Sequence, residues 1–192
     1  MKKNKGVLIG PSKCDEGRKQ KEKEIDEIWS TLTNNEGFKE AYPLFGPALD
    51  LFREALSCYQ NGAYMATVLM CRSVTEVLVY LVATRDIKEI LKNGIGEIEM
   101  SIELCDAQYG ELLEKAKEKL PVIRELECKI NKIREKGNFV AHYGQRLDKK
   151  LKKDVSIEVE MWITKEDALD ILKKTACILN ETVNRVMKLY LV

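Results

Sequence analysis

The segment 63–83, AYMATVLMCRSVTEVLVYLVA, constrains the fold of this chain more than any other part of the sequence. It is apolar over nearly the length that a helix needs to cross a membrane. Arg72 and Glu76 lie at its centre, however, and a charged side chain in lipid costs several kcal/mol. We therefore expect a helix that is buried on most sides in the core of a soluble protein.

The rest of the chain is large enough to surround such a helix. It has 192 residues, of which 45% are hydrophobic, and this allows one well-buried domain with small appendages. The 32 Lys+Arg and 31 Asp+Glu residues leave a formal net charge of +1. No overall electrostatic field therefore attracts nucleic acid or acidic lipid, and binding of either must depend on a local patch.

The cysteines and the N-terminus indicate a cytoplasmic protein. The six cysteines form no CxxC pair and show no spacing typical of a metal site. Cys71 and Cys177 lie in apolar runs, where a reduced thiol is usually found. The first apolar run, Val7 to Ile9, is too short for a signal peptide. We expect a reduced, cytoplasmic chain without a metal or another cofactor.

Apolar spacing predicts the first helices. Residues 1–24 are highly charged and have no apolar period, so we expect a mobile arm before a single domain of residues 25–192. A short amphipathic helix begins near Ile25. The segments NNEGF and AYPLFGP predict a loop, with Pro47 in the first turn of the next helix. That helix ends at an Asn-Gly turn, and the apolar helix 63–84 returns antiparallel to it.

Two other segments have the period of a β-strand. Residues 97–105 and 155–163 alternate apolar residues with polar or acidic ones over four or five repeats. Each segment would have one apolar face. Because two strands alone are marginal in water, we expect a small two-stranded ribbon that lies on the helices.

The second half of the chain is otherwise helical. A long helical pattern covers residues 109–143 and is broken or kinked near Pro121. The last helix starts at Thr164, which forms a capping-box pattern with Asp167, and extends to about Leu191. The expected fold class is therefore mainly α, a bundle of four or five main helices with a small β ribbon.

The single histidine, His142, lies near the end of the pattern 109–143. At about 100° per residue, the helix places it with three other polar residues in a sector of roughly 80°, namely Asn131, Arg134 and Asn138. Gly137 lies on the adjoining apolar side, although glycine costs about 1 kcal/mol relative to alanine inside a helix. We expect either a close approach by a neighbouring helix or a break at Gly137.

Arg72 and Glu76 form the second polar group. They are four residues apart on the apolar helix, so their side chains should face each other. One interpretation is a structural ion pair that fixes the register of the helix, although desolvation offsets much of its attraction. The other is that the pair borders a polar pocket shared with Asn138 and His142.

The order of these motifs resembles a known family. A helix with RSVTE, a helix with IREKGNFVAH and a helix that opens with ITKEDA are similar to domain of unknown function 4145, a branch of the HEPN-like (higher eukaryotes and prokaryotes nucleotide-binding) helical proteins. The resemblance covers about residues 45–190 and depends on the combination of both polar groups. It implies a HEPN-like helical bundle.

The resemblance also implies a candidate activity. Active HEPN ribonucleases have an arginine, often followed directly by a polar residue, and a histidine with four to six residues between it and the arginine; the site forms across a homodimer. The imidazole can transfer the ribose 2′-OH proton while arginine stabilises the phosphate, without a metal. Asn138 and His142 match this pattern, but Gly137 stands in the position of the arginine. Arg134 lies on the same helical face with seven intervening residues, and Lys136 has the spacing but faces the opposite side.

A basic run, residues 146–154, follows the histidine directly. It is either a loop that contacts phosphates of RNA or DNA or a solvated connector. It has no aromatic residue for base stacking, although Tyr143 precedes it. The candidate binding residues are therefore Arg72, Glu76, Tyr143, Arg146, Lys149 and Lys150.

Three functions remain open from the sequence. The first is a HEPN-like binding and dimerisation module that engages nucleic acid or a protein partner, with a degenerate ribonuclease-type motif. The second is a metal-independent endoribonuclease with His142, Asn138 and Arg134 as catalytic residues. The third, a subunit of a defence or toxin–antitoxin assembly, follows from family analogy alone. His142 itself is a structural hydrogen-bonded residue, a catalytic or phosphate-contacting group, or part of a polar ligand pocket.

Overall fold

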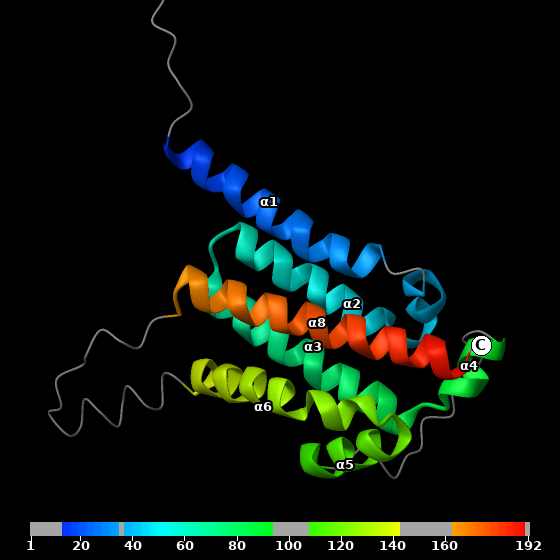
Figure 1. Ribbon diagram of the computed structural model, residues 1–192. Helices are drawn as coiled ribbons and strands as arrows, with labels where there is room; N and C mark the ends of the chain where they lie inside the picture. The colour runs from blue at the N-terminus through cyan, green and yellow to red at the C-terminus, as the bar shows by residue number, and fades with distance from the viewer. Residues whose placement is uncertain (1–12, 35–36, 94–107, 143–162, 191–192) are drawn as a thin grey trace, which may run out of the picture.

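The computed structural model of the protein describes residues 13–34, 37–93, 108–142 and 163–190. These residues form seven α-helices, and no strand occurs among them (Figure 1). The helices are α1 (Lys13–Thr33), α2 (Phe38–Gln60), α3 (Tyr64–Thr84), α4 (Ile87–Asn93), α5 (Tyr109–Lys119), α6 (Val122–Ala141) and α8 (Lys165–Tyr190). The expected mainly helical fold class is confirmed.

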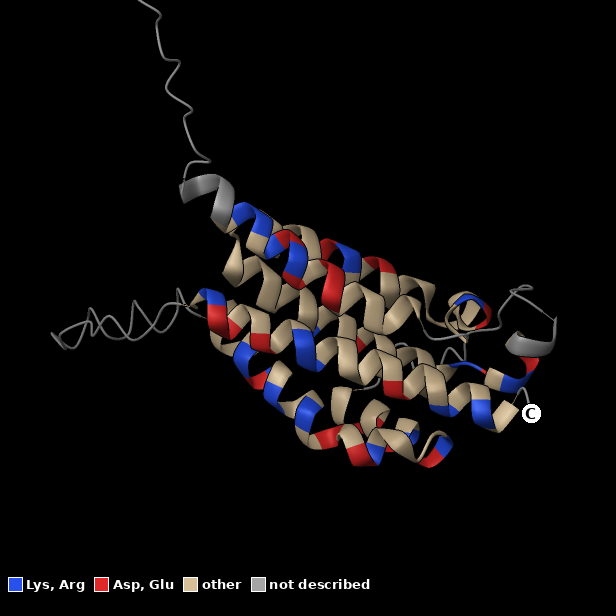
Figure 2. Ribbon diagram, turned by 45° about the horizontal axis from the view of Figure 1, so that its top comes forward, with Lys and Arg blue, Asp and Glu red and all other residues tan. Residues whose placement is uncertain are grey.

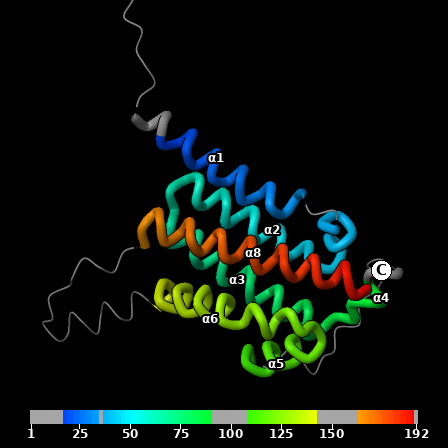
Figure 3. Tube along the Cα trace, in the orientation of Figure 1, coloured from blue at the N-terminus to red at the C-terminus, as the bar shows by residue number. Residues whose placement is uncertain are grey.

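The apolar helix α3 lies at the centre of the bundle. It packs against α2, α5, α6 and α8, while α1 lies along the outside of α2 and α8 (Figures 1 and 3). Its inner positions, such as Val68, Val74, Leu78 and Val82, are almost inaccessible to solvent. Length and composition alone would let α3 cross a membrane, but half of its apolar window is buried against other helices. Core helices of globular bundles share both properties.

Helix α2 begins earlier than the sequence predicts. The segment AYPLFGP was expected to be a loop, but α2 starts at Phe38 and contains both Pro43 and Pro47. The prolines remove backbone donors and bend the helix, and the first turns of α2 lie at an angle to the rest (Figure 1). Burial of Leu44 and Phe45 in the core favours the helix despite the prolines. The Arg85 guanidinium also donates to the Leu44 carbonyl oxygen at 3.0 Å.

Helix α1 also extends beyond its expected bounds. It begins at Lys13 rather than near Ile25, so residues 13–24 are helical. Ion pairs and hydrogen bonds with a spacing of four residues, such as Arg18 with Glu22, stabilise a helix that has no apolar period there. Positive and negative residues alternate along it (Figure 2). Residues 1–12 lie outside the described part of the chain.

The expected helix boundaries after residue 108 are confirmed. Helix α5 ends at Lys119 and α6 begins at Val122, so Pro121 separates them as expected. The backbone N–H of Thr164 donates to Asp167 Oδ2, and the N–H of Asp167 donates to Thr164 Oγ1, both at 3.1 Å. This is the predicted capping box.

The predicted ribbon falls almost wholly on residues that the structure does not describe. Residues 97–105 and 155–162 lie outside the described ranges. Only Ile163, the last residue of the second expected strand, is described, and it is buried just before α8. The ribbon therefore stays a prediction.

Candidate functional site

Gly137 is the point of closest approach between α3 and α6. A Cβ atom placed on this buried residue would lie 2.6 Å from Arg72 Cδ and 2.7 Å from Arg72 Cβ. Helix α6 continues through Gly137 to Ala141 without a break. Of the two expectations for this glycine, the close approach of a neighbouring helix is confirmed, and the break is wrong.

The approach of the two helices places an ion pair at their junction. Arg72 Nε donates to Glu76 Oε1 at 2.8 Å, so the predicted facing of these side chains is confirmed. The side chains keep 24% and 30% of their surface exposed. A pair that is only partly removed from water gains little net stability.

Arg134 joins this pair from α6. Its Nε lies 3.7 Å from Glu76 Oε1, and its guanidinium carbon lies 4.2 Å from the centre of the Tyr109 ring. Glu76 is therefore shared by two guanidinium groups, and the ring of Tyr109 covers one of them. Among the described residues, neither the Tyr109 hydroxyl nor Arg134 Nε has a hydrogen-bond partner.

The electrostatic environment of Tyr109 keeps its hydroxyl protonated. Burial is the main cause that raises its pKa to about 12; the charge of Arg134 lowers the pKa, and the charges of Glu76 and Glu127 raise it. Farther along α5, Lys117 Nζ lies 2.7 Å from both Glu114 and Glu127 and joins α5 to α6. These bonds raise the pKa of Lys117. In the cluster of Arg72, Glu76, Arg134 and Tyr109, one carboxylate is thus shared by two guanidinium groups.

His142 lies apart from the cluster. It is exposed at the C-terminal end of α6, where its backbone N–H donates to the Asn138 carbonyl oxygen at 3.0 Å. Among the described residues, its imidazole makes no hydrogen bond or ion pair with Arg72 or Glu76. The structural interpretation of His142 allowed a hydrogen bond either to that pair or to a backbone carbonyl oxygen. The exposed imidazole does not make the first of these bonds, and the second stays a prediction.

The direction of the helices explains this separation. Gly137 contacts Arg72, and Arg134 contacts Glu76, so α3 and α6 are antiparallel. His142 comes five residues after Gly137, about 7 Å farther along α6 and away from Glu76. The structure brings together Arg72, Glu76 and Arg134, whereas His142 and the half-buried Asn138 lie beyond them.

The remaining predicted binding residues are not among those that the structure describes. Tyr143, Arg146, Lys149 and Lys150 lie outside the described ranges. Sequence reasoning missed Tyr109 and Lys117, because the helical spacing within α6 cannot reveal a side chain contributed by α5. Within the described ranges, no group of three or more His, Cys, Asp or Glu side chains could hold a metal ion.

Comparisons of the chain with protein-family models, with curated proteins and with solved structures found no match.

Proposed function

We propose that this chain is a HEPN-like helical module that dimerises and binds a partner without strong catalysis. The first candidate for this partner is a nucleic acid. The observation that carries this proposal is the contact of Gly137 with Arg72. In an active ribonuclease of the HEPN type, an arginine would stand at position 137. Here any side chain at this position would overlap the Arg72 stem, including its Cβ, which is fixed to the backbone.

Arg134 is a poor substitute for the missing arginine. It lies about 12 Å along the helix axis from His142, because eight positions separate them at about 1.5 Å each. Its charge already faces Glu76, and its guanidinium lies against Tyr109. Binding to a phosphate would require Arg134 to leave both partners, whereas transition-state stabilisation needs a donor that is already in place.

The outer face of α3 supports dimerisation. Its half-buried residues recur at helical spacing on one side of the helix. They are Ala66, Leu69, Met70, Ser73 and Val77. The face is apolar, with Glu76 at its edge, and such a face is typical of a surface that packs against another chain.

A test of the nucleic-acid part uses labelled single-stranded RNA in EDTA. We expect salt-sensitive binding and no cleavage above a protein-free control. Changing Lys149→Ala together with Lys150→Ala should weaken binding about tenfold near 0.15 M salt, because each lost phosphate contact removes part of the counterion release. The control, Lys39→Ala with Lys88→Ala, removes the same charge from exposed positions on α2 and α4. Equal weakening by both pairs, or no binding, would contradict the proposal.

The same assay decides the second candidate, an endoribonuclease that uses His142 with Arg134 and Asn138. The exposure of His142 at the end of α6 is the observation that favours it. Cleavage that is lost in His142→Ala would establish this candidate and overturn the non-catalytic proposal. Cleavage that survives His142→Ala would eliminate the candidate, because such cleavage would come from a contaminating nuclease.

A test of dimerisation uses light scattering during size-exclusion chromatography. We expect the mass of two chains for the unchanged protein and of one chain for Leu69→Glu with Val77→Glu, because two buried carboxylates would face the partner. Leu189→Glu places one such charge on an apolar side chain of α8 that is 52% exposed, and should leave the dimer intact. A single-chain mass for the unchanged protein would exclude a dimer.

A further inference from the structure

Helices α6 and α8 lie side by side and run in opposite directions. Three contacts between their side chains show this, because residue numbers rise along α6 as they fall along α8. The contacts join Glu125 Oε1 to Arg185 Nη2 at 3.6 Å, Lys129 Nζ to Cys177 Sγ at 3.2 Å, and Lys136 Nζ to Asp167 Oδ1 at 3.0 Å. Residues 129–136 of α6 therefore lie beside residues 167–177 of α8.

Five lysines lie on these two stretches. Lys129, Lys132 and Lys136 are three and four residues apart on α6, so they share one face of the helix. Lys173 and Lys174 lie on α8. Figure 2 shows Lys and Arg on neighbouring turns of α6 and α8. We call these five residues the lysine strip, which extends about 10 Å along α6.

Carboxylates neutralise only two of the five lysines. Lys136 pairs with Asp167 at 3.0 Å, and Lys174 pairs with Asp170. Both aspartates belong to α8. The other three lysines therefore determine the charge that the strip presents to a ligand.

Lys129, Lys132 and Lys173 are exposed and have no acidic partner among the described residues. Lys129 contacts a cysteine sulfur rather than a carboxylate. Lys173 lines a hollow together with Glu27, but the carboxylate of Glu27 lies 3.8 Å from Lys23 Nζ. These three ammonium groups can therefore bind an anion without breaking an ion pair.

Two exposed carboxylates limit this positive surface. Glu135 comes one turn after Lys132 on α6, and Glu181 comes one turn after Cys177 on α8. The surplus charge is therefore local, as the net charge of +1 for the whole chain requires. Three unpaired lysines can contact about three phosphates, so the expected binding surface is short.

We propose that the lysine strip binds the phosphate backbone of a nucleic acid. This inference rests on the proposed function, because it names the surface that would hold the nucleic-acid partner. Each contact between an ammonium group and a phosphate releases counterions, and this release favours binding. Neither stretch contains an aromatic residue on which a base could stack, so we expect binding that does not depend on base sequence.

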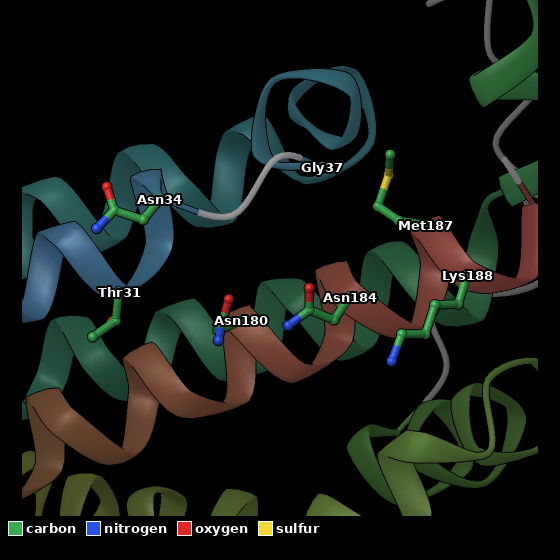
Figure 4. Close-up of a pocket in the computed structure, with 7 residues that line it drawn as sticks. All are labelled: Thr31, Asn34, Gly37, Asn180, Asn184, Met187 and Lys188. Carbon is green, nitrogen blue, oxygen red and sulfur yellow. The ribbon is translucent and has the colours of Figure 1, made fainter. Parts of the chain in front are cut away.

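The groove between α1 and α8 offers the same ligand much less charge. It consists of two adjoining hollows of about 470 and 350 Å³, and both are lined by Thr31 and Asn180. Lys188 is the one cation among the residues that line the larger hollow, and Figure 4 shows it pointing away from α1. The smaller hollow is lined mainly by apolar atoms.

The test measures the binding of fluorescein-labelled single-stranded RNA of mixed sequence by fluorescence anisotropy at several salt concentrations. Changing Lys129, Lys132 and Lys173 to Gln together should raise the Kd about 50-fold near 0.15 M salt. The slope of log Kd against log salt should fall by about 2, because each phosphate contact on a single strand contributes about 0.7. The control changes three exposed lysines of α2, α4 and α5 to Gln and should alter neither quantity: Lys39, Lys88 and Lys115.

Lysine-to-arginine changes at the same three positions of the strip separate charge from folding. This variant keeps the positive charges, so it should keep the Kd and the salt slope of the unchanged protein. Equal Kd values in the strip and control variants, an unchanged salt slope, or weak binding by the arginine variant would each overturn the proposal. Tighter binding to vesicles rich in phosphatidylserine than to RNA would also overturn it.

The same titrations distinguish this proposal from the proposed function. RNA binding by the unchanged protein that survives the three glutamine changes would overturn the lysine strip alone, and the nucleic-acid partner would remain. No RNA binding by the unchanged protein would overturn both.

Discussion

The junction of α3 with α6 and the junction of α1 with α8 differ in how closely their two helices pack. At the first, a glycine brings the helices so close that the Arg72 stem lies where a Cβ would be. At the second, short polar side chains leave two adjoining hollows. The first junction is inside the bundle and has no freedom to admit a ligand. The second junction is peripheral, and part of its surface is accessible to a ligand.

Different interactions hold the two junctions together. Close packing dominates between α3 and α6, and the ion pair of Arg72 with Glu76 lies at its edge. Helix α1 is instead fixed by Glu24, whose carboxylate accepts the Tyr59 hydroxyl at 2.6 Å and faces Lys165 Nζ at 3.0 Å. The α1 junction should therefore respond to charge and pH, and the α6 junction to volume.

The largest expected effect comes from added volume at the tight junction. Gly137→Val would place side-chain atoms on the fixed Cβ of Arg72, and we expect a loss of about 3 kcal/mol in the free energy of unfolding. Gly17→Val is the matched control on α1, where nothing lies within 4 Å of an added Cβ. It should change stability by less than about 0.5 kcal/mol. Urea denaturation of both variants measures the difference, and equal losses would contradict the close contact.

The second effect concerns charge at the α1 junction. Burial raises the pKa of Glu24, but hydrogen bonds from Tyr59, Lys165 and Gln20 outweigh it, so its pKa lies below 4.5. A carboxyl group with a lowered pKa stabilises the fold above its ordinary pKa and loses that contribution as the pH falls through the lowered value. Glu24→Gln should therefore cost about 1–2 kcal/mol at pH 7.

The pH dependence is the control for this second prediction. In urea denaturation below pH 4.5, the difference between Glu24→Gln and the unchanged protein should shrink, because the carboxyl group becomes neutral in both states. A difference that stays constant from pH 7 to pH 2.5 would show that the carboxylate charge does not hold α1 in place.

Sequence reasoning predicted the parts of the molecule that depend on neighbours along the chain. The bounds of α3, the interruption near Pro121 and the facing of Arg72 with Glu76 follow from helical spacing and were confirmed. The close approach at Gly137 was predicted as one of two alternatives, because a glycine on an apolar face indicates either contact or a break.

The remaining features depend on contacts between distant segments. Core burial of Leu44 and Phe45 outweighs the two prolines in α2, and no local rule gives that balance. The position of Tyr109 over Arg134 depends on how α5 folds back. The exposure of His142 depends on where α6 ends relative to α3. One interpretation placed this histidine beside Arg72 and Glu76, but the antiparallel arrangement of the two helices directs the end of α6 away from Glu76.

The smallest expected effect concerns α8, which forms one junction with α1 and also packs against α3 and α6. Thr164→Ala removes the hydroxyl that accepts the Asp167 N–H at 3.1 Å, and loss of such a cap costs about 1 kcal/mol. The matched control, Lys136→Ala, removes the other partner of Asp167, an ammonium group 3.0 Å from its carboxylate. That pair is more than one-third exposed on both sides, and exposed pairs contribute about 0–0.5 kcal/mol. Thermal unfolding should therefore show a lower Tm for Thr164→Ala than for Lys136→Ala. The reverse order would mean that the ion pair between α6 and α8 contributes more to stability than the cap of α8 does.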